Sequence, residues 1–499
     1  MRPHGSMGLR SCYSIVQRSL STSTSVFGGL PSQVSGNDDT LGSLQNYTGY
    51  LAGAINSIFA KTIAATQVLG LNVDSGSGPA KPVVTETSKT GAPIKAQVLK
   101  YTFEKQVSRT EVTNRTRALV KKYPRLIAAL LKTVGSTDID ATLRAEARQC
   151  LTLCGCQPAV KSRGVNILSI DGGGTRGMMG LEVLEQLEKV TEKKICELFD
   201  YVVGVSTGGI IASLLVGKGY NVNDCRAIYV DVSRRLFSQN RFTGVSGVVL
   251  NHSYYDTKKW VKILKEIIGE ELTLIETSKE SIPRLGIVAA VPYVFRNYEP
   301  PAGRDSHYRG STGHFLWQAI QASAAAPLYF EEVKLGHFLL QDGGIIANNP
   351  TAIGIHEAKL LWPEERLHCV VSVGNGRSVC DLEQESNGSS PSTLSSLQKF
   401  NRIVDSATNT EAVHMCMHDL LDQNVYFRLN PYMTAPYGLD EIDPKKLKQM
   451  QNDAKLYVRR NMSKIEEASA RLLQKPSILQ QNVRRFEEWM DERGMYSPR

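Results

Sequence analysis

Short apolar runs alternate with amphipathic, helix-length stretches from residue 165 onward, and this alternation restricts the fold more than any other feature. The stretch 178–190, for example, places Leu181, Leu184 and Leu187 on one face of a helix. Strands that are apolar along their whole length are typical of a parallel sheet covered by helices. We therefore predict an α/β fold with a mainly parallel sheet, whose buried strands are residues 165–170, 201–205, 285–291, 338–340 and 367–373.

The 499 residues exceed what one core usually needs, so we expect further segments on both sides of the α/β unit. Residues 161–440 are assigned to the α/β domain. Residues 441–499 are charged and are assigned to a C-terminal helical extension. One apolar stripe runs along that extension, formed by Leu447, Met450, Ala454 and Tyr457.

The chain in front of the α/β domain is predicted to be helical or of low complexity. Residues 1–37 contain nine serines, three arginines and no acidic residue, which is typical of a mitochondrial transit peptide. A disordered tail without an address is the alternative. Residues 38–73 have apolar side chains at helical spacing, 74–97 form a linker rich in Gly, Ser, Pro and Thr, and 98–160 form a basic helical region.

The net charge of +9 is concentrated at the front of the chain. Residues 1–150 hold 18 basic and 9 acidic residues, which accounts for the whole excess. Within them, Lys121, Lys122 and Arg125 stand beside an apolar run, a pattern typical of a helix that docks on anionic lipid. We expect an anionic phospholipid membrane surface as partner, and no nucleic acid. For this helix, ordinary packing against the α/β domain is an equal alternative to docking on lipid, and for the charge as a whole a solvated basic face without a partner is the alternative.

The nine cysteines are scattered and odd in number, which indicates reduced thiols in an intracellular protein. The tightest cluster is Cys150, Cys154 and Cys156, which has no C-x-x-C pair and no nearby histidine. We therefore expect no metal site. We also expect no membrane-spanning helix, because polar residues interrupt every long apolar stretch.

The first chemical motif is Asp171-Gly172-Gly173-Gly174-Thr175-Arg176-Gly177, placed between a predicted strand and a helix. Consecutive glycines let the backbone approach a ligand, and the helix N-terminus adds positive potential, so the loop suits a phosphate or an oxyanion. The run also fits the dinucleotide fingerprint G-x-G-x-x-G. That fingerprint needs an acidic residue after the second strand, whereas Asp200 precedes it. We expect no nucleotide and no other cofactor.

The second motif, Gly204-Val205-Ser206-Thr207-Gly208, also lies between a predicted strand and a helix. A serine on such a sharp turn needs small residues two positions away on either side, as Gly204 and Gly208 are. The helix N-terminus beside Ser206 would stabilise anionic charge that develops there.

The third motif is Asp342-Gly343-Gly344, after the predicted strand 338–340. A serine hydroxyl needs a neighbour that accepts its proton, and a carboxylate at a strand end can do so. By itself, D-G-G is also a common turn. The histidines that follow Ser206 are alternative bases, although packing or solvation explains each of them equally well; they are His356, His414 and His418.

In order and spacing, these three motifs resemble those of the patatin-like phospholipases. The flanking stretches 294–298, 317–320 and 323–327 look most like the gamma type of calcium-independent phospholipase A2. The resemblance covers roughly residues 160–490 and implies a three-layer α/β/α sandwich without calcium or a catalytic histidine. It also implies roles for the residues of the site. Ser206 would be the nucleophile, and Asp342, in a loop with Gly343 and Gly344, would be the proton acceptor. Gly172, Gly173 and Gly174 with Arg176 would form the oxyanion site.

We therefore expect a calcium-independent phospholipase that releases fatty acid and lysophospholipid through a Ser–Asp dyad and an acyl-enzyme. A transacylase or a neutral-lipid lipase would use the same residues. A catalytically silent lipid-binding protein would predict damage to at least one motif, and all three are intact.

The cellular address has competing indications. Vertebrate gamma-type enzymes resemble one another in ending with a peroxisomal tripeptide, whereas this chain ends Ser497-Pro498-Arg499. The N-terminal segment favours the mitochondrion, and the peroxisome or the endoplasmic reticulum membrane are alternatives.

Overall fold

The computed structural model describes residues 124–136, 141–238, 254–279, 282–301, 303–378 and 409–492. The predicted transit segment, the apolar segment and the linker lie outside the described residues, as do Lys121 and Lys122 of the basic region. Among the helices of the described ranges, none is both long enough and apolar enough to cross a bilayer.

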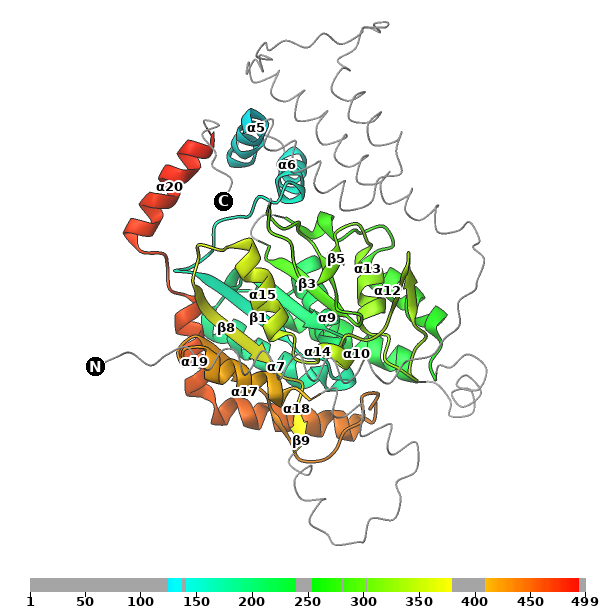
Figure 1. The fold of residues 1–499 in the computed structure, drawn as a ribbon. Helices are drawn as coiled ribbons and strands as arrows, with labels where there is room; N and C mark the ends of the chain where they lie inside the picture. Colours follow the sequence, from blue (N-terminus) through cyan, green and yellow to red (C-terminus); the bar gives the residue numbers. More distant parts are fainter. Residues whose placement is uncertain are drawn as a thin grey trace, which may run out of the picture. The chain divides into compact units, whose positions relative to one another are not determined.

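Seven strands form the central sheet, in which β4 runs antiparallel to β3 and every other neighbouring pair is parallel. The predicted α/β fold with a mainly parallel sheet is confirmed (Figure 1). In spatial order the strands are β10 (Tyr426–Leu429), β8 (Leu367–Val373), β1 (Val165–Ile170), β2 (Tyr201–Val205), β3 (Arg284–Ala289), β4 (Tyr293–Arg296) and β5 (Arg309–Ser311).

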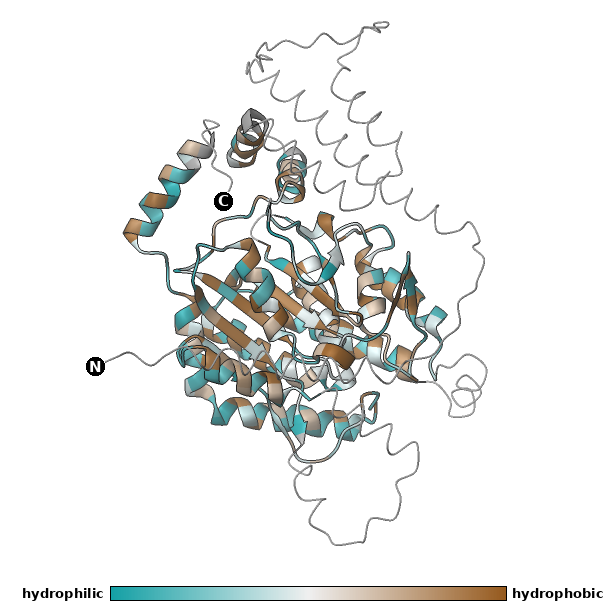
Figure 2. Ribbon diagram, in the orientation of Figure 1, coloured by the Kyte–Doolittle hydropathy of each residue, from teal (hydrophilic) through white to brown (hydrophobic). Residues whose placement is uncertain are grey.

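Helices cover both faces of this sheet, so that alternate residues of a strand enter two different cores. Leu168 and Ile170 of β1 belong to one core, and Val165 and Ile167 to the other. The strands of the sheet are mostly brown in Figure 2, the colour of hydrophobic residues, as expected for a sheet that is buried on both sides. The first core includes α7 (Gly177–Thr191), α9 (Thr207–Ala212), α10 (Val222–Phe237), α12 (Thr257–Ile268), α13 (Leu316–Ser323) and α19 (Met462–Leu472), and the second includes α15 (Thr351–Leu361).

The shorter elements connect these layers. Among them, α14 (Gly344–Ala347) follows Asp342, α17 (Glu411–Leu420) precedes β10, and α9 continues into the π-helical turn Ser213–Gly217. The others are α8 (Ile195–Leu198), the 3-10 turns Gly174–Arg176 and Ile275–Thr277, and the strand pair β9 (Arg377–Ser378) and β11 (Tyr432–Met433).

The strand predicted at residues 338–340 is present, but its predicted place in the buried sheet was wrong. Phe338–Leu340 forms β7, which pairs only with β6 (Val333–Leu335) in a separate hairpin, and Leu339 is 58% exposed. In so short an apolar run, hydrophobic periodicity cannot distinguish a strand of the core sheet from a strand of a separate hairpin. The prediction also missed β4 and β10, because each of them carries a buried arginine, Arg296 or Arg428, that interrupts the apolar pattern.

The C-terminal helices are α18 (Pro444–Arg460), α19 and α20 (Ile478–Glu492). The predicted stripe is confirmed, because Met450 and Ala454 are fully buried and Leu447 packs against the same cluster. Before the first strand of the sheet in the sequence, α5 (Pro124–Gly135) and α6 (Ala141–Leu153) share a small core. Cys150 and Cys154 lie in it, and burial raises the pKa of both thiols.

Candidate active site

Three turns meet at the carboxyl edge of the parallel strands, where α/β proteins usually bind ligands. The glycine loop, residues 171–177, follows β1, and Ser206 follows β2. Asp342 forms an isolated antiparallel bridge with Ala289, the last residue of β3. The fold therefore brings the three predicted motifs together, although up to 171 positions separate them in the sequence.

Ser206 lies on a strained turn between β2 and α9. Its φ is 51° and its ψ is −120°, a left-handed conformation that residues with a side chain rarely adopt. A Cβ on Gly204 would lie 2.2 Å from the carbonyl oxygen of Gly208, and a Cβ on Gly208 would lie 2.1 Å from that of Ile170. Both glycines predicted around the serine are therefore required by backbone contacts.

The hydroxyl of Ser206 donates a hydrogen bond of 2.6 Å to Oδ2 of Asp342. The other carboxylate oxygen, Oδ1, accepts from the backbone N–H of Gly344 at 2.7 Å. A Cβ on Gly343 would lie 2.3 Å from the carbonyl oxygen of Val288, so the turn behind the carboxylate packs directly on β3. Both predicted glycines thus help to fix the direction of the Asp342 carboxylate.

Burial raises the pKa of Asp342 to about 6, against the lowering effect of its hydrogen bonds from Ser206 and Gly344. The side chain is nearly inaccessible to water, so the ionised form has lost most of its hydration. A carboxylate with a pKa near 6 is ionised at neutral pH and is a stronger base than an ordinary aspartate.

The glycine loop packs directly against Ser206. A Cβ on Gly172 would lie 3.3 Å from the Cβ of Ser206, and Gly174 has a φ of 55° that favours glycine. The N–H of Gly172 donates to the carbonyl of Asn348 at 3.1 Å and is therefore not available to a ligand. The N–H groups of Gly173 and Gly174 have no comparable acceptor among the described residues.

Arg176 supports the loop from its C-terminal end. Its Nε donates to the carbonyl of Gly173 at 3.2 Å, and the residue lines the cavity described next. The carbonyl of Gly174 accepts from the hydroxyls of Tyr229 and Thr207. The contact with the Gly173 carbonyl orients the peptide group that carries the open N–H of Gly174, and the contacts with the Gly174 carbonyl fix the next peptide group of the loop.

A cavity of about 450 Å³ opens over Ser206 and Asp342. Gly173 and Gly174 line the same cavity as the serine. The remaining lining is largely apolar and suits a hydrocarbon chain. It includes Leu236, Phe237, Trp260, Leu328, Phe330 and Ile345.

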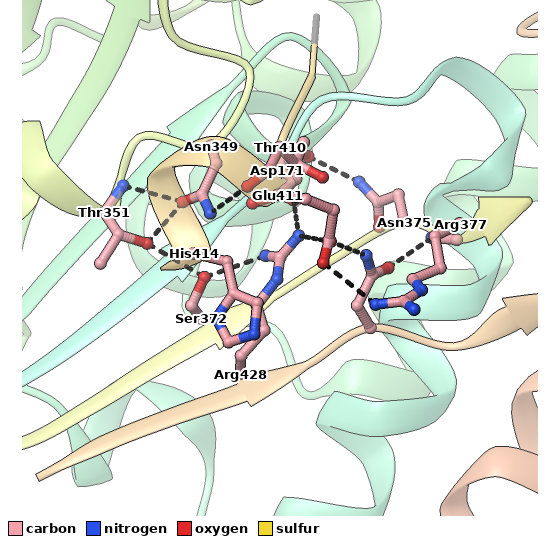
Figure 3. A network of polar contacts seen from close by, with 12 residues as sticks. Asp171, Asn349, Thr351, Ser372, Asn375, Arg377, Thr410, Glu411, His414 and Arg428 are labelled. Atoms are coloured by element: carbon pink, nitrogen blue, oxygen red, sulfur yellow. Dashed lines mark hydrogen bonds and ion pairs between the residues drawn. The ribbon is translucent and has the colours of Figure 1, made fainter. Parts of the chain in front are cut away.

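Three residues around these turns were not predicted from the sequence. Ser323 accepts from the N–H of Ser206 at 2.8 Å and donates to the carbonyl of Val288 at 2.6 Å, which holds the strained turn on β3. Asn375 and Arg428 bind Asp171 at the start of the glycine loop (Figure 3). Ser323 lies in a stretch that already suggested the family, whereas no motif identifies the other two.

The alternative histidine bases contact other groups. Nε2 of His356 accepts from the backbone of His307 at 3.3 Å, and Nδ1 of His414 lies 3.3 Å from the hydroxyl of Tyr426. The ring of His418 lies beside that of His414. In the described part of the chain, the hydrogen bond of the Ser206 hydroxyl runs to Asp342, and no group of three or more His, Cys, Asp and Glu side chains is placed to hold a metal.

Comparison with known proteins assigns the segment that contains these motifs to a family. Residues 168–355 match the patatin-like phospholipase family. These residues form a patatin-like phospholipase domain. The predicted resemblance is thereby confirmed, and the matched segment contains Ser206, Asp342 and the glycine loop.

Several relatives extend the match beyond the patatin-like domain. Calcium-independent phospholipase A2-gamma of Oryctolagus cuniculus is 38% identical over 418 residues, which cover 76% of this chain and 52% of that protein. The Homo sapiens protein of the same name matches with the same values. Phospholipase A I of Arabidopsis thaliana is 30% identical over 346 residues, covering 57% of this chain and 26% of that protein. The chain spans about half the length of the gamma-type relatives.

Because the pKa of Asp342 is raised, we expect the stability of the patatin-like domain to depend on pH. Because the pKa rises from 3.8 to about 6 on folding, ionisation of Asp342 should destabilise the fold progressively as pH increases through that window. Two pKa units correspond to about 3 kcal/mol. Asp342→Asn should therefore raise the melting temperature at pH 8, and the gain should shrink as pH falls toward 4. An equal or lower melting temperature at pH 8 would contradict this account.

Proposed function

We propose that this protein is a phospholipase that hydrolyses fatty-acyl esters of glycerophospholipids, with Ser206 as nucleophile and Asp342 as its proton acceptor. The observation that carries the proposal is the 2.6 Å hydrogen bond between these two side chains in a largely apolar cavity. The names of the gamma-type relatives support the substrate class and the independence from calcium.

In the proposed reaction, Oγ of Ser206 attacks the ester carbonyl carbon while its proton passes to Asp342. The carbonyl oxygen becomes an oxyanion that accepts hydrogen bonds from the N–H groups of Gly173 and Gly174. When the C–O bond to the glycerol breaks, the leaving lysophospholipid oxygen takes the proton from Asp342. A water molecule then attacks the acyl-enzyme, with Asp342 again accepting the proton. When the bond from the acyl carbon to Oγ of Ser206 breaks, Oγ takes that proton back and the fatty acid leaves.

The shape and charge of the site suit these steps. The apolar wall would hold the acyl chain, so that its ester group lies next to Ser206. The positive end of α9 and the open N–H groups of the glycine loop would stabilise the oxyanion. The N–H of Gly172 is already bonded to Asn348, so we assign Gly172 a packing role rather than a donor role.

A transacylase or a neutral-lipid lipase would use the same residues with another acceptor or another ester. Analysis of the lipid products distinguishes them, because only phospholipid hydrolysis yields fatty acid and lysophospholipid in equal amounts.

The nucleophile can be tested directly. A fluorophosphonate probe should label Ser206, and Ser206→Ala should abolish labelling and hydrolysis while the domain stays folded. Ser238→Ala is the matched control, because this serine is exposed and lies outside the cavity lining. A chelator should leave hydrolysis unchanged. Labelling at another residue, or wild-type activity in Ser206→Ala, would refute the assignment.

We further propose that the basic region 98–134 docks the enzyme on anionic membranes. Each basic residue near such a surface contributes about 1 kcal/mol, and salt screens the effect. Hydrolysis of anionic vesicles should therefore fall steeply with salt, whereas hydrolysis of a short soluble ester should not.

Replacement of Lys121, Lys122 and Arg125 by Glu should remove that salt dependence. The control replaces three exposed lysines of α18 by Glu, with the same change in net charge; these are Lys445, Lys448 and Lys455. Tight vesicle binding by the first variant at low salt would leave the basic region as a solvated face only.

The N-terminal composition supports a mitochondrial address as part of the same proposal. A fluorescent reporter fused to residues 1–40 should accumulate in mitochondria, and replacing Arg2, Arg10 and Arg18 by Gln should abolish the import. A diffuse cytosolic signal from the unmodified fusion would exclude this address.

A further inference from the structure

Asp171 anchors the glycine loop at the point where it leaves β1. Its backbone N–H donates to the carbonyl of Val373 at 3.0 Å, and its carbonyl accepts from Nδ2 of Asn375 at 2.5 Å. Its carboxylate accepts from Nη2 of Arg428 at 2.6 Å. Asn375 also packs on Gly173, where an added Cβ would lie 2.8 Å from the Cβ of Asn375.

Arg428 reaches Asp171 from β10, across the intervening strand β8. Its Nη1 donates to Oγ of Ser372 on β8 at 2.9 Å, so two separate bonds fix the direction of the guanidinium. Glu411 of α17 lies 3.7 Å from Nη2 and also binds Arg377 at 3.0 Å. Figure 3 shows the resulting network between the glycine loop, the sheet and α17.

Burial of the Asp171–Arg428 ion pair costs desolvation free energy, so the pair contributes little net stability to the core. Their side chains are only 1% and 3% exposed, and burial raises the pKa of Asp171 to about 6 in spite of the arginine. Well-packed apolar side chains often stabilise a fold as much as a buried ion pair does. The ion pair provides something that apolar packing does not, namely a fixed direction for the residue that starts the glycine loop.

The pair also controls charge beside the proposed oxyanion site. An ionised Asp171 without a partner would lie at the base of the loop whose N–H groups face the developing negative charge, and it would oppose that charge. Arg428 neutralises the carboxylate and holds it away from the cavity lining, in which neither residue takes part.

We propose that Arg428 is a positioning residue of the patatin-like domain, which acts through Asp171 to hold the N–H groups of Gly173 and Gly174 toward the oxyanion. This inference rests on the proposed ester hydrolysis. Arg428 should therefore affect the transition state and leave ground-state lipid binding unchanged.

The test compares wild type with Arg428→Gln at a temperature where both are folded. We expect kcat/KM to fall by about tenfold or more, but by less than the roughly 100- to 1000-fold loss caused by removing an oxyanion donor itself. A trifluoromethyl ketone, which forms a tetrahedral oxyanion with the serine, should bind more weakly by the same factor. A non-hydrolysable ether phospholipid should bind with unchanged affinity.

Arg296→Gln is the matched control. Arg296 forms another buried ion pair, with Glu357 at 2.7 Å and side chains that are 5% and 1% exposed, but it does not contact the glycine loop. This variant should lose stability and keep its kcat/KM once folded. If Arg428→Gln does not fold, the double variant Asp171→Asn/Arg428→Gln replaces it, because it also lacks the directed ion pair but buries no unpaired carboxylate, and its kcat/KM should fall by a smaller factor. Arg428→Lys keeps the positive charge and should retain part of the kcat/KM that Arg428→Gln loses.

Three results would overturn the proposal. They are an unchanged kcat/KM in folded Arg428 variants, an equal loss of ether-lipid affinity, or the same loss of kcat/KM in Arg296→Gln. Failure of the proposed function is a different result, because wild type would then show no hydrolysis that depends on Ser206.

Discussion

The backbone contact between the turns after β1 and β2 is the constraint on which the site depends. Gly208 approaches the carbonyl of Ile170 so closely that no side chain fits between them. This contact sets the glycine loop beside Ser206 and points both loops out of the same edge of the sheet. The position of the open N–H groups of the glycine loop relative to Ser206 depends on that approach.

Much of the fold and the three motifs could be predicted, because both depend on local signals. Apolar runs identified β1, β2 and β8, and small residues identified the strand-to-helix turns. The spatial meeting of Asp342 with Ser206 was expected only through the resemblance to a family, since no local pattern connects positions 136 residues apart.

The features of the fold and the site that were not predicted include buried charged residues. Arg296 and Arg428 made β4 and β10 look unlike core strands, yet each arginine is buried because a carboxylate lies opposite it. A hydropathy pattern counts every arginine as polar and cannot detect a partner that comes from another element. Among the strands that were not predicted, β4 and β10 are therefore those that bring in the internal ion pairs. For the same reason, Arg428 was absent from the predicted site.

The left-handed backbone of Ser206 bears on selection. A non-glycine residue in this conformation costs stability that glycine would largely recover. A protein that only bound lipid would gain from relaxing the turn, since its apolar cavity does not need the hydroxyl. A serine at this turn therefore fits the proposed role of its hydroxyl as the nucleophile. The strained turn thus argues for an enzyme over a silent lipid-binding protein, on grounds separate from any resemblance.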